Sequence, residues 1–97
     1  MAQKKKKIDY EALHSSFMQI PQMKTEIARG LLDAGFNKGY ELVGRAPEVV
    51  IEQILTQHPE LKTIPDLRER VRLAIYFVET TEPEPAMLKL SYWTAFN

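Results

Sequence analysis

The sequence contains no cysteine, which excludes thiolate nucleophiles, disulfide bridges and cysteine-ligated metal or redox sites. It also lacks any apolar run near the roughly 20 residues that a membrane-spanning helix needs. Strand-like alternation of polar and apolar residues does not extend over a useful length, and no long-period solenoid repeat occurs. With 44% apolar residues in a chain of 97, we expect one soluble, cytoplasmic all-α domain.

Residues with catalytic or metal-binding chemistry are also scarce. His14 and His58 lie on different expected helices, and neither has a second ligand three or four residues away, so no metal site is expected. Ser15 follows His14 directly, but neighbours on a helix point in different directions and do not form a nucleophile and base pair. We therefore expect no enzyme activity, no cofactor and no metal.

The net charge of zero hides an uneven distribution. Lys4, Lys5, Lys6 and Lys7 are four of the 13 basic residues, and without them the chain has 9 basic against 13 acidic side chains. An acidic body cannot grip a phosphate backbone over a broad surface, so any nucleic-acid contact must be local. Residues 1–8 are interpreted as a flexible basic arm that either binds nucleic acid or only keeps the protein soluble. No secretory signal follows the lysines.

The spacing of apolar residues and the prolines predict five helical segments and a C-terminal tail. Asp9 is suited to cap the first helix, Gly35 to end the second in a left-handed conformation, and Pro47 to start the fourth. The expected segments are 9–20, 25–34, 38–43, 47–58 and 65–80, followed by a proline and glutamate tether from 81 and an aromatic segment to 97. The expected apolar stripes are Leu13, Phe17 and Ile20; Met23, Ile27, Leu31 and Ala34; Phe36, Tyr40 and Val43; Val50, Ile51, Ile54 and Leu55; and Leu67, Val71, Ala74, Ile75 and Val78.

A weak internal duplication accompanies these segments. A helix, a turn and a helix are expected at about 9–34 and again at about 37–58. Two such hairpins packed back to back would share one core.

The stretch "IPQMKTEIARGLLDAGFNKGYELVGRAPEVV" resembles a double helix-hairpin-helix unit. The first hairpin of that unit reads apolar, Pro, Gly, apolar, Gly, two variable residues, then apolar and Ala, and here Ile20, Pro21, Met23, Ile27 and Ala28 match it. Over about 9–94 the chain is similar to the small helix-hairpin-helix family labelled pathogenicity-locus or mitomycin-resistance proteins. "RLAIYFVE" and the aromatic "YWT" match its last helix and tail.

This resemblance implies a five-helix double helix-hairpin-helix (SAM-like) body, residues 9–80, that contacts nucleic-acid backbones without reading sequence. Gln22 and Lys24 stand where the hairpin glycines would be. Glycine allows a left-handed backbone and lets amide groups approach a phosphate closely. Gln22 therefore either carries the strain of a left-handed residue or lies in a turn of another shape, and we expect the second, with Pro21 starting the helix early.

The candidate nucleic-acid site lies at this turn. Lys24 would place a cation, and Thr25 a hydroxyl, beside free amides at a helix start. Arg45, next to Gly44, would supply a second contact if the hairpins are related by a pseudo-twofold axis. The candidate residues are Gln22, Met23, Lys24, Thr25, Gly44, Arg45 and the lysine arm, Lys4 to Lys7. The alternative is that Lys24 and Thr25 are simply solvated and that Arg45 pairs with a glutamate.

The sequence thus predicts a non-catalytic DNA-binding module, weak and without sequence preference. The alternative is a protein-interaction or dimerisation module that has lost the phosphate-binding glycines. Tyr92, Trp93 and Phe96 would stack on bases, dock into a partner or mediate a homodimer, or would fold back over the domain, which we expect. Arg68 and Arg72 are expected to form a solvated face of the last long helix.

Overall fold

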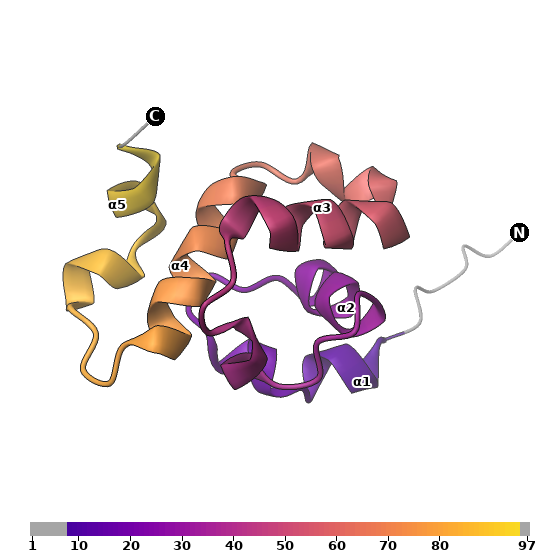
Figure 1. Cartoon of the computed structure of the whole chain (residues 1–97), viewed down its shortest axis with the longest axis horizontal. Coiled ribbons are helices and arrows are strands. Elements are labelled where there is room, and N and C mark those ends of the chain that lie inside the picture. Colours follow the sequence, from indigo (N-terminus) through magenta and orange to yellow (C-terminus); the bar gives the residue numbers. More distant parts are fainter. Residues whose placement is uncertain (1–7, 96–97) are drawn as a thin grey trace, which may run out of the picture.

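The computed structural model describes residues 8–95, and all regular structure within that range is helical, which confirms the all-α class (Figure 1). Five α-helices alternate with four short 3₁₀ helices. The α-helices are α1 (Tyr10–Leu13), α2 (Thr25–Asp33), α3 (Pro47–Gln57), α4 (Leu67–Glu79) and α5 (Leu90–Thr94). The 3₁₀ helices are η1 (Ser16–Gln19), η2 (Gly39–Leu42), η3 (Pro59–Thr63) and η4 (Pro85–Leu88).

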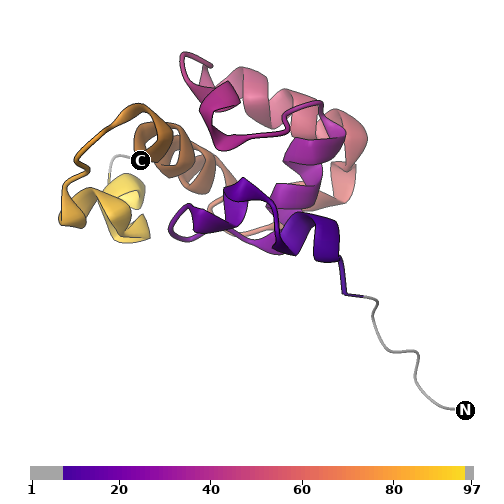
Figure 2. The same ribbon diagram turned by 90° about the horizontal axis from the view of Figure 1, so that it is seen from below.

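Helices α2 and α3 lie side by side, α4 packs against α3 and η2, and α5 lies on the other side of α4 (Figures 1 and 2). One hydrophobic core joins α1 to α4. Its largest fully buried side chains are Phe17, Ile27, Leu31, Leu42, Val50, Ile54 and Leu73. Helices α2 and α3 approach closely because Gly30 has no side chain: a Cβ there would lie 2.8 Å from Cγ2 of Ile54.

The expected single helix over 9–20 is wrong, because α1 ends at Leu13 and a 3₁₀ helix follows. Asp9 does cap α1, since its side chain accepts a hydrogen bond from the Ala12 amide at 3.2 Å. The Ser15 hydroxyl then donates to the Ala12 carbonyl at 2.7 Å and competes with the helical hydrogen bonds. The break changes which side chains face the core, so Leu13 is 40% exposed while Phe17 is fully buried.

The helix ends around Gly35 follow the prediction. Gly35 has a φ of +106°, and the amides of Gly35 and Phe36 donate to the carbonyls of Leu32 and Leu31 in a Schellman motif. In the next segment the expected apolar stripe is right for the buried Phe36 and wrong for the other two residues: Tyr40 is 71% and Val43 50% exposed. Leu42 is buried instead, because η2 is a 3₁₀ helix with a period of three rather than 3.6.

The second half of the chain is closer to expectation. Pro47 is the first residue of α3, and Val50 and Ile54 face the core while Ile51 and Leu55 are partly buried beside it. In α4 the expected stripe is buried from Leu67 to Ile75, with Val78 partly buried. The structure adds one residue that the stripe omitted, the fully buried Leu73.

The C-terminal aromatic segment packs on α4. The ring of Trp93 lies 5.8 Å from that of Tyr76, and its Nε1 donates to the Met87 carbonyl at 2.8 Å. The Tyr76 hydroxyl accepts a hydrogen bond from the Glu84 amide at 2.9 Å. These contacts hold η4 and α5 to one side of α4. The expected extended tether from 81 instead bends at residues 81–82 and ends at Glu84, directly before η4.

An internal repeat exists, but its second copy is not at 37–58 as predicted. The turn before α2 recurs before α4, 44 residues later in the chain, so that Ile20 and Pro21 correspond to Ile64 and Pro65. The amides of Ile20 and Ile64 each donate at 3.0 Å to the buried residue three positions earlier. Gln22 and Asp66 then both have left-handed backbones, with φ of +64° and +60°. The repeated units are therefore α1–η1–α2 and α3–η3–α4, joined through η2.

We predict that Gly30→Val destabilises the protein by about 2 kcal/mol, because the added carbons overlap Ile54 and push α2 away from α3. The change should appear in urea unfolding followed by circular dichroism. Gln53→Val, on the exposed surface of α3, is the matched control and should shift stability by less than about 0.5 kcal/mol. Equal effects of the two substitutions would contradict the close contact.

Candidate nucleic-acid interface

The turn before α2, which we call the first turn (Ile20–Lys24), has the left-handed shape that glycine usually provides. The Met23 amide donates to the Ile20 carbonyl at 3.3 Å, and Gln22 has a φ of +64°. The expectation that Pro21 would start the helix early is wrong, since α2 begins at Thr25. Gln22 accepts a strain of about 1 kcal/mol because the flanking Ile20 is buried and fixes the turn.

The start of α2 leaves backbone donors open. The carbonyl of Lys24 accepts from the amides of Ile27 and Ala28, at 2.9 and 3.0 Å. The amides of Lys24, Thr25 and Glu26 have no hydrogen-bond acceptor within residues 8–95, and no side chain caps the helix. Free amides at a helix start, together with the helix dipole, favour an anion.

Two cations at the first turn, Lys24 within it and Arg70 in contact with it, have no carboxylate partner in the described part of the chain. Lys24 makes no ion pair there, and neither does Arg70. Nη1 of Arg70 donates to the Gln22 carbonyl at 2.7 Å, and its Nε to the Pro65 carbonyl at 3.3 Å. Arg70 thus joins the first turn to its repeat. Glu26, exposed in the first turn of α2, opposes an anion, and so do Asp9 and Glu60, which line the same pocket as Thr25 and Glu26.

The repeat of this turn, which we call the second turn (Ile64–Arg68), has the same backbone and a different chemistry. Asp66 replaces Gln22, and Glu69, only 6% exposed, replaces Thr25. Arg68, at the position that corresponds to Lys24, forms an ion pair with Glu48 of α3, with 3.7 Å between Nη2 and Oε2. Carboxylates at two of these positions repel a phosphate, so the repeat offers one anion-binding turn rather than two.

Gly44 and Arg45 do not join the first turn. Gly44 takes its predicted positive φ, +79°, but its amide donates to Oε2 of Glu79 at 2.7 Å. Arg45 lies over the Phe36 ring, 5.5 Å from its centroid, and its Nε donates to a backbone carbonyl. Glu79, which binds the Gly44 amide, and Arg70, which contacts the first turn, are separated by about 13 Å along α4.

The remaining predicted residues are placed as follows. Met23 is partly buried against the core beside the first turn. Lys4 to Lys7 and Phe96 lie outside the described residues. Tyr92 and Trp93 are partly buried, with ring centroids 5.1 Å apart. Arg72, like Arg68, faces Glu48 of α3, at 3.8 Å, rather than a glutamate of its own helix.

Sequence reasoning missed Arg70 and the second turn. A signal for the turn was present, because "IPQMK" at 20–24 and "IPDLR" at 64–68 share an apolar residue, proline, a polar residue, an apolar residue and a cation. No comparable signal marked Arg70. Its contact with Gln22 spans 48 positions and arises only when α4 packs beside the first turn.

An ion network centred on Arg29 lies along α2, beside the pocket that Thr25 and Glu26 also line. Arg29 binds Asp9 at 2.8 Å, Glu11 at 2.7 Å and Asp33 at 2.9 Å, and Asp33 in turn meets Nε2 of His58 at 2.6 Å. Hydrogen bonds from Arg29, and then from the Ala12 amide, lower the pKa of Asp9 from 3.8 to about 2. The Asp33 carboxylate raises the pKa of His58 above its usual value.

Neither a metal-binding cluster nor a membrane-spanning helix is found in this range. Across residues 8–95 no group of three or more histidine, aspartate or glutamate side chains is arranged to hold a metal ion. No helix described there combines the length and the apolar character needed to cross a lipid bilayer.

Comparison with known proteins gives no match, whether the chain is compared with models of protein families, with curated proteins or with solved structures. The resemblance to the helix-hairpin-helix family therefore stays a prediction. The function has to be inferred from the geometry of the site itself.

We predict that Asp9→Asn, which keeps the helix cap but removes the charge, changes how stability depends on pH. A carboxylate with a lowered folded pKa stabilises the protein above its unfolded pKa of 3.8, and this contribution is lost as pH falls through about 2. Urea unfolding should find the wild type more stable at pH 6 and the two proteins similar near pH 2. A difference that is the same at both pH values would contradict the contact with Arg29.

Proposed function

We propose that the protein is a non-catalytic module that binds the nucleic-acid backbone, DNA in the first instance, through its first turn. The observation that carries the proposal is the open set of amides at Lys24, Thr25 and Glu26. Lys24 and Arg70, which form no ion pair within residues 8–95, belong to or contact the same turn. A phosphate oxygen accepts hydrogen bonds from such amides and from the Thr25 hydroxyl, while the two cations neutralise its charge. None of these groups reads a base, so no sequence preference is expected.

The repeat of two units, each with an Ile-Pro turn and a left-handed residue, supports the interpretation as a double helix-hairpin-helix body. Gln22 occupies the glycine position with a glycine-like backbone. Its side chain is exposed. The substitution therefore costs strain without removing the turn.

Binding through one turn should be weak. The described residues carry 9 basic and 13 acidic side chains, so the rest of the body repels a polyanion. The lysines at 4–7 would add charge, each neutralising about one phosphate. Affinity should therefore fall steeply with salt.

A second candidate function, a protein-interaction module, is favoured by a separate observation. Asp66 in the second turn and Glu69 directly after it stand at the positions of Gln22 and Thr25, and the second turn borders an open apolar groove. This surface suits a protein partner and not a phosphate. The two functions use different turns of the repeat and are compatible with each other.

We predict that Lys24→Glu weakens binding to labelled single-stranded and duplex DNA by about threefold to tenfold at low salt. The slope of log affinity against log salt should fall by about one, because one phosphate contact is lost. Fluorescence anisotropy of the full chain at several salt concentrations measures both quantities.

Lys89→Glu is the matched control, since Lys89 is an exposed lysine near α5 and away from the first turn. Arg45→Glu tests the other predicted site, at Gly44 and Arg45, and should change affinity less than Lys24→Glu. Equal losses for all three variants would mean that only net charge matters and would refute a site at the first turn. So would the absence of any DNA binding at low salt.

A further inference from the structure

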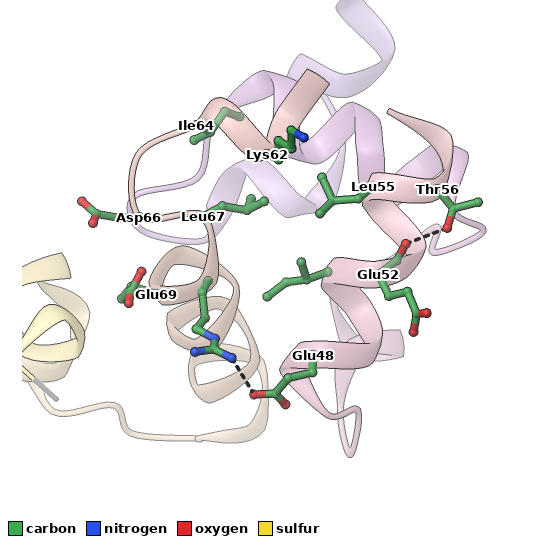
Figure 3. Close-up of a pocket in the computed structure, with 11 residues that line it drawn as sticks. Glu48, Glu52, Leu55, Thr56, Lys62, Ile64, Asp66, Leu67 and Glu69 are labelled. Carbon is green, nitrogen blue, oxygen red and sulfur yellow. Dashed lines mark hydrogen bonds and ion pairs between the residues drawn. The ribbon is translucent and has the colours of Figure 1, made fainter. Parts of the chain in front are cut away.

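A groove of about 740 Å³ opens between α3 and the second turn, on a surface that the proposed nucleic-acid contact does not use (Figure 3). Residues of α3 spaced three and four apart form one side, and η3, the second turn and the start of α4 form the other. The volume lies within the range of roughly 300 to 1,000 Å³ that is usual for ligand pockets.

The floor of this groove is apolar and incompletely covered. Ile51 and Leu55 from α3, and Ile64 from the second turn, pack on the core but remain partly exposed. Leu67 is 8% exposed. An apolar ligand that covered these side chains would remove their remaining surface from water, which is favourable at about 25 cal/mol per Å².

The rim is acidic on both sides. Glu52 on α3 and Asp66 on the second turn flank the floor, and neither forms an ion pair with any residue in 8–95 (Figure 3). Of the side chains that line the groove, four are carboxylates and two are cations. One of those cations, Arg68, already faces Glu48 at 3.7 Å. The charge of the rim thus attracts cations and repels phosphate.

We propose that this groove binds a short amphipathic helix of a partner protein, with apolar side chains on the floor and lysine or arginine side chains opposite Glu52 and Asp66. The groove follows the face of α3, an 11-residue helix about 16 Å long, which matches anchors at i, i+3 or i+4 and i+7. Residues 8–95 contain no strand, so they offer no sheet edge to an extended peptide.

The test uses the full-length protein and a fluorescein-labelled peptide with leucine and lysine at helical spacing. The same peptide with glutamate in place of lysine is the charge control. We expect anisotropy to rise with the lysine peptide only. Glu52→Lys should weaken its binding by about threefold to fivefold at low salt, as for an exposed charge pair. Glu82→Lys, an exposed glutamate in the tether, is the matched control and should have a smaller effect.

Leu55→Ala tests the apolar floor and should weaken peptide binding by about tenfold, at high salt as well as at low salt. Thermal unfolding of this variant checks that it is folded, and Glu52→Lys, a surface change, tests the groove independently of it. Methyl NMR of the wild type should show peptide-induced shifts at Ile51, Leu55 and Ile64.

Several outcomes would overturn the proposal. They are equal binding of the glutamate peptide, peptide-induced shifts that avoid the groove, and affinity unchanged by both Glu52→Lys and Leu55→Ala. DNA that displaced the peptide and shifted the same methyl groups would also count against it. Lys24→Glu should leave peptide binding unchanged, so this inference can fail or succeed independently of the nucleic-acid proposal.

Discussion

The left-handed backbone at two residues that are not glycine, Gln22 and Asp66, determines how this small protein is built. Each lies in an Ile-Pro turn whose isoleucine is anchored by a 3₁₀ hydrogen bond, and each reverses the chain into a long helix. The strain is of the order of 1 kcal/mol per residue, and burial of Phe17, Ile20 and Leu61 around the turns offsets it. Without this reversal the two helical units α1–η1–α2 and α3–η3–α4 would not share a core.

Arg70 connects the two turns, and the chemistry on either side of it differs. Its guanidinium donates to the Gln22 carbonyl of the first turn and to the Pro65 carbonyl of the second. The first turn has open amides beside Lys24, whereas the second has Asp66 and a groove with an acidic rim. A duplicated backbone thus carries one surface suited to an anion and another suited to a cation, which is why we assign them different ligands.

Much of the fold was predictable from local signals, and the errors have identifiable causes. The cap at Asp9, the glycine end at Gly35 and the proline start of α3 depend on a few neighbouring residues and were predicted. The break after Leu13 and the burial of Leu42 in place of Tyr40 were missed. Both involve 3₁₀ segments, where the period of the apolar pattern changes and a stripe drawn for an α-helix points to the wrong residues.

By itself, the sequence determined the all-α class and the starts and ends of the three longest helices, α2, α3 and α4, to within about two residues. Each follows from spacing, capping and proline within one or two helical turns. Tertiary packing decided that Gln22 would have a left-handed backbone, that Arg70 would donate to its carbonyl, and that Glu79 would accept a hydrogen bond from the Gly44 amide. These contacts join positions 35 and 48 apart, so they arise only when α4 packs against both halves of the chain.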